Sequence, residues 1–163
     1  MTLGIRKAVA ADEEAIWAIL EPVIRAGETY ALDPAMSRED TLSYWLGADR
    51  STWVACTAEG EIVGTYYLRA NQAGGGAHVA NCGYMVASGT HGKGVGRTMA
   101  RHSLDEARHA GFSAMQFNFV IASNTRAIAL WEELGFATLA RVPDAFIHPH
   151  KGPVDALVMH RRL

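Results

Sequence analysis

The chain has 163 residues, 49% of them apolar, which is enough for one domain with a buried core. The formal net charge of -2 and the scattered Lys and Arg residues argue against a nucleic-acid partner. No apolar run reaches the ~20 residues that span a bilayer, and residues 1–4 lack the blocks of a signal peptide. We therefore expect a cytoplasmic protein with no membrane partner. Cys56 and Cys82 are too few for a disulfide framework.

The first third of the chain predicts one short strand and two helices. Residues 3–7 have strand character. Asp12 then provides an N-cap for a helix whose apolar residues recur at spacings of three and four, and Gly27 ends this helix. Pro22 inside the pattern predicts a kink or the last turn. A short second helix follows at residues 37–46, where a Ser and an Asp three residues later resemble a capping box.

The rest of the chain alternates between β-rich runs and helical patterns. The β-rich runs predict strands at residues 52–57, 62–68, 77–86, 114–121, 136–142 and 154–160. One helix opens at the glycine stretch 91–97 and a second covers residues 124–134. We expect residues 143–153 to be one long surface connection. This order predicts a single α/β domain over residues 1–163, with one mixed, mostly antiparallel sheet of about seven strands and helices on both faces.

The glycine stretch carries the clearest chemical signal. Gly92, Gly94 and Gly96 leave backbone amides uncovered where a strand ends and a helix begins, and the free N–H groups and the dipole of that helix attract an anion. The spacing fits neither a Rossmann fingerprint nor a Walker loop. The sequence therefore predicts a different anion site, made of His91, Gly92, Lys93, Gly94, Val95, Gly96 and Arg97.

Two separate segments match the motifs of one family. The first is Met85-Val86 followed by His91-x-x-Gly94-x-Gly96, and the second is Asn124-x-x-Ala127-x-x-Leu130-Trp131-x-x-Leu134-Gly135-Phe136. They resemble the acetyl-CoA motif Gln/Arg-x-x-Gly-x-Gly/Ala and the second motif Asn-x-x-Ala-x-x-Leu-Tyr-x-x-Leu-Gly-Phe of the GCN5-related N-acetyltransferase (GNAT) superfamily. In order and separation they identify the chain as a member, which implies acetyl transfer from acetyl-CoA to an amine.

The resemblance assigns the parts of acetyl-CoA to particular residues. It implies that the pyrophosphate lies on the glycine stretch and that the pantetheine arm runs along the backbone of Met85 and Val86. It also implies a hydrogen bond from Asn124 to the pantetheine, although a plain helix N-cap explains an Asn there equally well. His91 replaces the usual Gln or Arg, at a position that contributes mostly backbone.

Trp131 is the larger departure from the family pattern. Many members have a Tyr there that is thought to protonate the departing thiolate, whereas an indole has no proton to give at working pH. We therefore expect Trp131 to be part of the core or of the surface that packs against CoA. The thiolate then leaves without a dedicated acid.

A narrower resemblance concerns the acceptor. His78-x-x-Asn81-x-Gly83-Tyr84-x-Val86, Phe117-Asn118-Phe119-Val120 and Asn124 are similar to the fungal proline-analogue (azetidine-2-carboxylate) N-acetyltransferases and their bacterial relatives. This resemblance implies that Asn81 and Asn118 hold the carboxylate of the acceptor, and an amide does so without adding charge. The alternative is that both amides are satisfied by neighbouring backbone. Against it, we expect Asn118 to lie inside an apolar strand, where an unpaired amide costs about 1–3 kcal/mol.

The attacking amine must lose a proton, so the reaction calls for a base. Glu28, in the loop of residues 28–34, is our candidate because this loop can close over the acceptor. His78 is an alternative by its pKa range, and Cys82 as an acetyl carrier lacks a His–Asp relay. The remaining histidines show no metal-binding spacing, so we expect no metal.

Together these signals predict an enzyme that moves acetyl from acetyl-CoA to the amine of a small amino or imino acid, by direct attack in a ternary complex. Two alternatives stay open. One is a non-catalytic acyl-CoA-binding sensor, which Trp131 favours, and the other is an acetyltransferase acting on a protein N-terminus or a lysine. The partner we expect is a small-molecule amine, and we allow for a homodimer.

Overall fold

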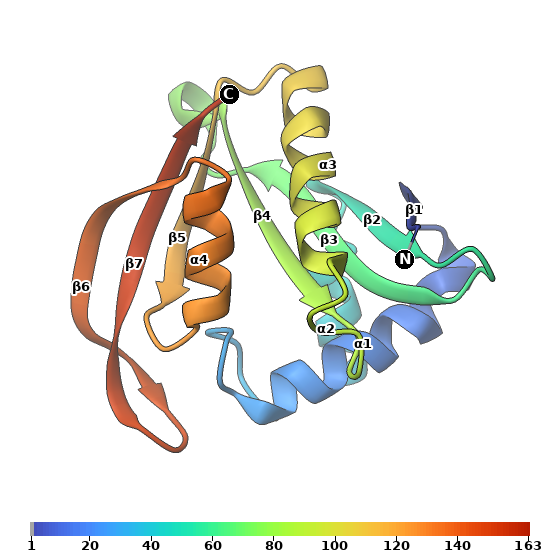
Figure 1. Cartoon of the computed structure of the whole chain (residues 1–163), viewed down its shortest axis with the longest axis horizontal. Coiled ribbons are helices and arrows are strands. Elements are labelled where there is room, and N and C mark those ends of the chain that lie inside the picture. Colours follow the sequence, from blue (N-terminus) through green and yellow to red (C-terminus); the bar gives the residue numbers. More distant parts are fainter. Residues whose placement is uncertain (1) are drawn as a thin grey trace.

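The computed structural model describes residues 2–163 as a central sheet with helices on both faces (Figure 1). The strands are β1 (Gly4–Lys7), β2 (Arg50–Cys56), β3 (Ile62–Ala70), β4 (Val79–Val86), β5 (Ala114–Ile121), β6 (Ala137–His148) and β7 (Gly152–Arg162). The helices are α1 (Glu13–Ala26), α2 (Arg38–Trp45), α3 (Val95–His109) and α4 (Thr125–Glu133), with two 3-10 turns, η1 (Ala10–Asp12) and η2 (Gly74–Gly76). None of the helices in the described part of the chain has the length and hydropathy to cross a bilayer.

The seven strands form one sheet in the order β1-β2-β3-β4-β5-β7-β6. All neighbours are antiparallel except β4 and β5, which are parallel and pair only at Val79–Ala114 and Ala80–Met115. Beyond these two pairs the strands diverge, and Figure 1 shows them separating toward the lower half of the molecule. The predicted mixed, mostly antiparallel sheet is therefore confirmed.

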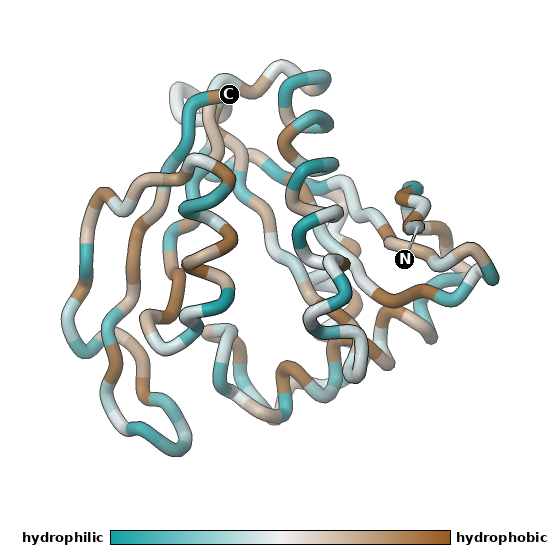
Figure 2. The backbone as a smooth tube through the Cα atoms, viewed as in Figure 1, coloured by the Kyte–Doolittle hydropathy of each residue, from teal (hydrophilic) through white to brown (hydrophobic). Residues whose placement is uncertain are grey.

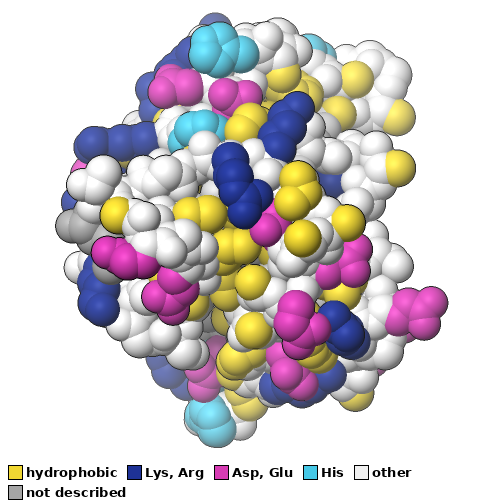
Figure 3. Space-filling model, turned by 90° about the vertical axis from the view of Figure 1, so that its right-hand side faces the viewer, with side chains coloured by type: hydrophobic (Ala, Val, Ile, Leu, Met, Phe, Trp, Pro, Cys, Tyr) yellow, Lys and Arg dark blue, Asp and Glu magenta, His cyan; other side chains and the backbone are white. Residues whose placement is uncertain are grey.

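Two apolar layers cover the two faces of the sheet. On one face, α1 and α2 bury Ile16 and Trp45 against Val54 of β2, and we refer to this as the α1/α2 layer. On the other face, α3 and α4 bury Met99 and Trp131 in the α3/α4 layer. Figure 2 shows hydrophobic and hydrophilic residues alternating around the helices, as amphipathic helices on a sheet require. On the face seen in Figure 3, basic and acidic side chains are intermixed.

The caps of the first two helices lie close to where the sequence predicts them. Gly27 has a left-handed φ of 63° and its N–H donates to the carbonyl of Ile24, so α1 ends there, and Pro22 lies within the helix. The Ser37 hydroxyl accepts the N–H of Asp40 at 3.0 Å. Asp12 precedes α1 as predicted, but its carboxylate accepts from the Val9 N–H and from Arg6 rather than from the helix.

The expected long connection at residues 143–153 is wrong. The structure continues β6 to His148 and starts β7 at Gly152, so the connection is a turn at residues 149–151. Pro143 lies in a bulge, where the register shifts between Val142 and Phe146 and Asp144 has φ 49°. An edge strand tolerates a proline at such a point because its outer N–H needs no ladder partner.

Candidate active site

A cavity of about 310 Å³ opens where β4 and β5 diverge. Its walls come from the loop after α1, from α2, β3, β4 and β5, and from α4 with its N-cap residue. Asn81, Asn118 and Asn124, which the sequence singled out separately, all line it. The parting of the two strands thus gathers residues that lie far apart in the chain around one space.

The cavity is lined from both layers of the protein. Tyr30 and Tyr67 belong to the α1/α2 layer, whereas Cys82 and Tyr84 pack in the α3/α4 layer. Successive residues of a strand point to opposite faces, so Asn81 shares the face of Tyr67 and not that of Cys82. The cavity therefore connects the two faces of the sheet, and ligands that approach from opposite sides can meet in it.

Asn118 lies in a different environment from the one expected. It is exposed, at a bulge where the register shifts between Phe117 and Val120, so the prediction of an amide enclosed by an apolar strand is wrong. Its Nδ2 donates to Oδ1 of Asn71 at 2.7 Å and its Oδ1 accepts from Gln116 at 3.1 Å. The bulge turns this amide toward the cavity and away from the ladder.

Asn124 caps a helix and lines the cavity at the same time. It occupies the N-cap position of α4, where its Oδ1 accepts the N–H of Ala127 at 3.3 Å. The cap uses the oxygen of the amide and not its NH₂ group. The two interpretations from sequence are therefore compatible, because one atom serves the helix and the other can serve a ligand.

The glycine stretch forms the N-terminus of α3. Gly94 is the N-cap, with φ 81° and no side-chain cap, and the N–H of Thr98 makes the first intrahelical bond, to Gly94. The amides of Val95, Gly96 and Arg97 therefore precede the first intrahelical donor, the Thr98 N–H, and are available to an anion. Gly94 reaches this left-handed φ without strain because it has no side chain.

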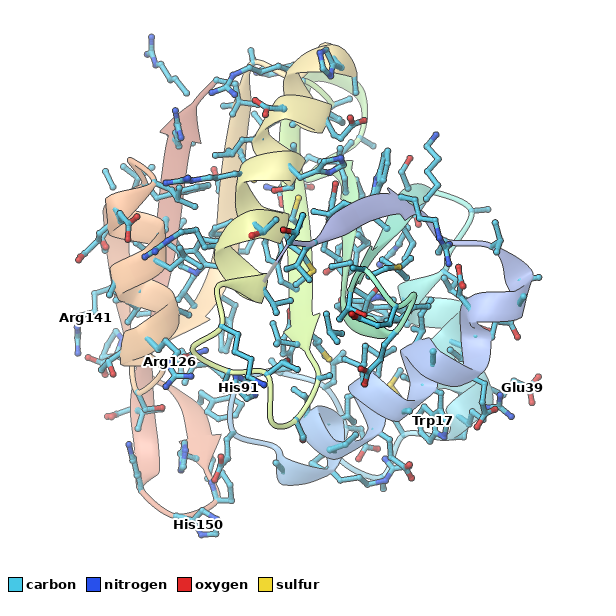
Figure 4. All side chains as sticks on the ribbon, turned by 45° about the vertical axis from the view of Figure 1, so that its right-hand side comes forward. Trp17, Glu39, His91, Arg126, Arg141 and His150 are labelled. Carbon is cyan, nitrogen blue, oxygen red and sulfur yellow. The ribbon has the colours of Figure 1, made fainter. Side chains whose placement is uncertain are left out.

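The side chains of this stretch contribute unequally. His91, Lys93 and Arg97 are exposed, but Arg97 pairs with Glu133 at 2.5 Å and so ties α3 to α4. Figure 4 shows His91 on the loop beside β4 and Arg126 at the first turn of α4. The loop fits a pyrophosphate through its amides, with Lys93 as an exposed positive charge beside them.

The backbone of β4 presents alternate groups to the gap. Ala87 donates to Val63 on β3, so the backbone groups of Val86 and Tyr84 point the other way, toward β5. The backbone of Met85 faces β3, and its side chain is buried in the α1/α2 layer. Of the two residues expected to pair with an extended arm, Val86 has the suitable backbone direction.

The Tyr30 hydroxyl, in the loop after α1, hydrogen-bonds the backbone of Tyr84. Tyr30 donates to the carbonyl of Tyr84 and accepts its N–H, both at 2.7 Å. Burial raises the pKa of the Tyr30 hydroxyl, so it stays protonated. The sequence does not predict this contact, because nothing in the local pattern of residues 28–34 indicates a partner on a distant strand.

Trp131 lies in an aromatic cluster at the cavity wall. Its ring centroid is 4.6 Å from that of Phe117 and 5.1 Å from that of Tyr84, and the residue is only 8% exposed. The expectation that Trp131 is part of the core is therefore confirmed. A contact with CoA stays a prediction.

The cavity wall is uncharged. Among residues 2–163, those that line it include no Asp, Glu, Lys, Arg or His. Burial raises the pKa of the Cys82 thiol to about 12 and holds that of Tyr84 well above its usual range. Cys82 is thus a neutral thiol near pH 7, which does not favour an acetyl carrier.

The two candidate bases lie outside this wall. The Glu28 carboxylate is half-buried, 3.4 Å from Nε2 of His150 in the β6–β7 turn, although its neighbour Thr29 lines the cavity. His78 is exposed ahead of β4. In the described residues there is no cluster of three or more His, Cys, Asp or Glu side chains that suits a metal ion.

The site combines a parallel pair of strands that part, a helix N-terminus with free amides, and a cavity lined from both faces of the sheet, which suits a ligand with an anionic end. The family model described as "Acetyltransferase (GNAT) family" matches residues 16–136. The chain belongs to this family, and it is an acetyl-CoA-dependent N-acetyltransferase.

Relatives extend over most of the chain. N-acetyltransferase aca1 of Schizosaccharomyces pombe is 29% identical over 153 residues, which cover 83% of this chain and 72% of that protein. A GCN5-related N-acetyltransferase from Kribbella flavida is 43% identical, with a TM-score of 0.95 over 99% of this chain and 98% of the other. A phosphinothricin acetyltransferase from Sinorhizobium meliloti in complex with AcCoA is 23% identical, covers 100% and 89% of the two chains and has a TM-score of 0.88, so it shares the fold. The predicted family and acetyl donor are confirmed.

Proposed function

We propose that this enzyme acetylates the nitrogen of a small amino or imino acid that binds on the α1/α2 side of the cavity. The observation that carries the proposal is the uncharged wall, in which amide and hydroxyl groups supply the polar contacts. A cavity of about 310 Å³ suits a small ligand. A zwitterion needs no net charge from its site, whereas a polyamine or a lysine side chain would require an acidic wall.

The acetyl donor would approach from the α3/α4 side. The amides of Val95, Gly96 and Arg97 would hold its pyrophosphate, and Val86 would hold its extended arm through backbone hydrogen bonds. Asn124 would add the NH₂ group that its helix cap leaves unused. Acetyl-CoA supplies a thioester carbonyl that is activated toward amines.

The acceptor would be oriented from the other face. Asn81 and Asn118 donate to its carboxylate and thereby aim its nitrogen into the gap between β4 and β5. The neutral amine forms the C–N bond, the C–S bond breaks, and the amine proton passes to solvent. Glu28 stays our candidate for assisting that proton transfer, through water, because its neighbour Thr29 lines the cavity while Glu28 itself is not part of the wall.

The test is thiol release from acetyl-CoA by the purified protein, over a panel of free amino acids, imino acids, polyamines and short peptides. We expect release with zwitterionic amino or imino acids and little with polyamines. Release with peptides alone would replace the proposal by a protein acceptor. Acetyl-CoA binding without release for any amine would favour a sensor.

Two further statements stay predictions from the sequence. One is a cytoplasmic location, which fractionation of cells that express the protein measures. The other is a homodimer, which sedimentation equilibrium measures.

A further inference from the structure

Two tyrosine hydroxyls meet on the acceptor side of the cavity. Tyr44 of α2 and Tyr67 of β3 both line it, and their oxygens are 3.3 Å apart. The usual O–H···O distance is about 2.7–2.8 Å, so this contact is weak. At most one of the two protons is used in it, which leaves hydroxyl donor capacity for a ligand.

A buried arginine stands behind both rings. The Arg50 guanidinium carbon is 4.9 Å from the ring centroid of Tyr44 and 4.7 Å from that of Tyr67. The Arg50 side chain is 7% exposed, and its Nε and Nη2 both donate to the carboxylate of Asp49, whose own side chain is 59% exposed. Nη1 of Arg50 is buried without a hydrogen-bond partner among the described residues. The positive charge of Arg50 therefore lies against the rings of the two tyrosines, and the solvent-exposed carboxylate of Asp49 is the group that offsets it.

The chain makes room for this arrangement at Gly83. Tyr67 lies opposite Gly83 in the β3–β4 register, and a Cβ at that glycine would be 2.6 Å from Cε1 of Tyr67. Only a residue without a side chain lets the ring lie across β4. Asn81 is two residues from Gly83 on the same face, so Asn81 and Tyr67 line the cavity from the same face of the sheet.

We propose that the hydroxyls of Tyr44 and Tyr67 bind the carboxylate of the acceptor beside Asn81. Arg50 is the positioning residue that makes this end of the cavity selective for a carboxylate. The inference rests on the proposed function and narrows it, since the acceptor must be a free acid and not its amide, its ester or a plain amine. The wall itself carries no charge, so the carboxylate owes its electrostatic stabilisation to Arg50 behind the rings.

The test compares a cyclic imino acid with its own carboxamide, azetidine-2-carboxylate and azetidine-2-carboxamide, in steady-state assays. The variants are Tyr44→Phe and Tyr67→Phe, which keep the ring, and Arg50→Met with Arg50→Lys. Tyr66→Phe is the matched control, because its hydroxyl bonds His102 outside the cavity.

We expect the Tyr44 and Tyr67 variants each to raise KM for the acid about tenfold and to leave KM for the carboxamide unchanged, as loss of a hydrogen bond to a charged group predicts. Arg50→Met likewise raises KM for the acid and leaves KM for the carboxamide unchanged. Arg50→Lys recovers part of the lost affinity for the acid. The Kd of acetyl-CoA, measured on every variant, stays at the wild-type value and shows that the variants are folded. Tyr66→Phe changes neither KM.

The outcomes separate the two proposals. If the acid is acetylated but the tyrosine variants raise KM for acid and carboxamide equally, or for neither, the carboxylate site is overturned and the proposed function stands. If wild-type protein acetylates neither compound and no other free amino acid, the proposed function is overturned and this inference with it.

Discussion

The hydroxyl of Tyr30 makes two 2.7 Å hydrogen bonds to the backbone of Tyr84, one to its carbonyl and one from its N–H. These backbone groups face the gap that β5 leaves, and no strand is there to pair with them. The Tyr30 side chain thus makes the hydrogen bonds to Tyr84 that a neighbouring strand would otherwise make. It also holds that loop against the cavity.

Replacing Tyr30 by Phe removes both bonds. We expect the free energy of unfolding to fall by about 1–3 kcal/mol, because a buried N–H and a carbonyl lose their partner. Urea unfolding measures this loss. Tyr44→Phe is the matched control and costs less, because its contact is 3.3 Å long. An equal fall in the free energy of unfolding of both variants would contradict a larger contribution from the Tyr30 hydrogen bonds.

Replacing Asn118 by Ala tests its proposed role with the acceptor. We expect KM for the acceptor to rise about tenfold while the Kd of acetyl-CoA stays nearly unchanged. Asn71→Ala is the control, since it removes the partner of Asn118 but no predicted ligand contact. Equal losses of affinity for acceptor and acetyl donor would contradict the assignment.

Replacing Gly94 by Ala tests the proposed anion site. With φ 81°, substitution by Ala costs roughly 1–2 kcal/mol of strain and displaces the first amides of α3, so we expect the Kd of acetyl-CoA to rise about tenfold. Gly60 has φ 88° in the turn between β2 and β3, with open space around it as at Gly94. Gly60→Ala should lose similar stability and bind acetyl-CoA normally. Calorimetric titration and thermal unfolding provide the two measurements.

The rate should follow the protonation of the acceptor. The cavity wall has no carboxylate or imidazole, and burial keeps the Tyr84 hydroxyl and the Cys82 thiol neutral, so the acceptor ammonium is the group that titrates. We expect kcat/KM to rise with pH and to level off near the pKa of the acceptor amine. An acceptor with a less basic amine shifts the profile to lower pH by the difference in pKa. A profile that stays fixed between the two acceptors would point to a base on the protein.

Cys82 provides a separate test of direct transfer. Its pKa of about 12 leaves almost no thiolate at neutral pH. We expect Cys82→Ala to keep kcat within about twofold, since a small buried thiol acts as a packing group. Mass spectrometry of the wild-type protein after incubation with acetyl-CoA alone should show no acetylated cysteine. Loss of activity without loss of stability would contradict direct attack.

Local patterns in the sequence were sufficient for most of the fold. The spacing of apolar residues in α1 and α3, the left-handed glycines Gly27 and Gly94 and the β-rich runs are each decided within a few residues, so they can be read without knowing what packs against them. The continuation of β6 through Pro143 could not be predicted in this way, because it depends on residues far away in the chain. A proline in a strand is acceptable only at an edge or a bulge, and which strand is the edge is a property of the whole sheet.

By itself the sequence determined the family and the acetyl donor and predicted the anion site, because these depend on contiguous residues from His91 to Arg97 and from Asn124 to Phe136. The tertiary structure decided which residues line the cavity between β4 and β5. The early parting of β4 from β5 brings Asn81 and Asn118 to one cavity and lets Tyr30 reach Tyr84. Such contacts follow from strand order and divergence, which no short-range spacing in the chain encodes.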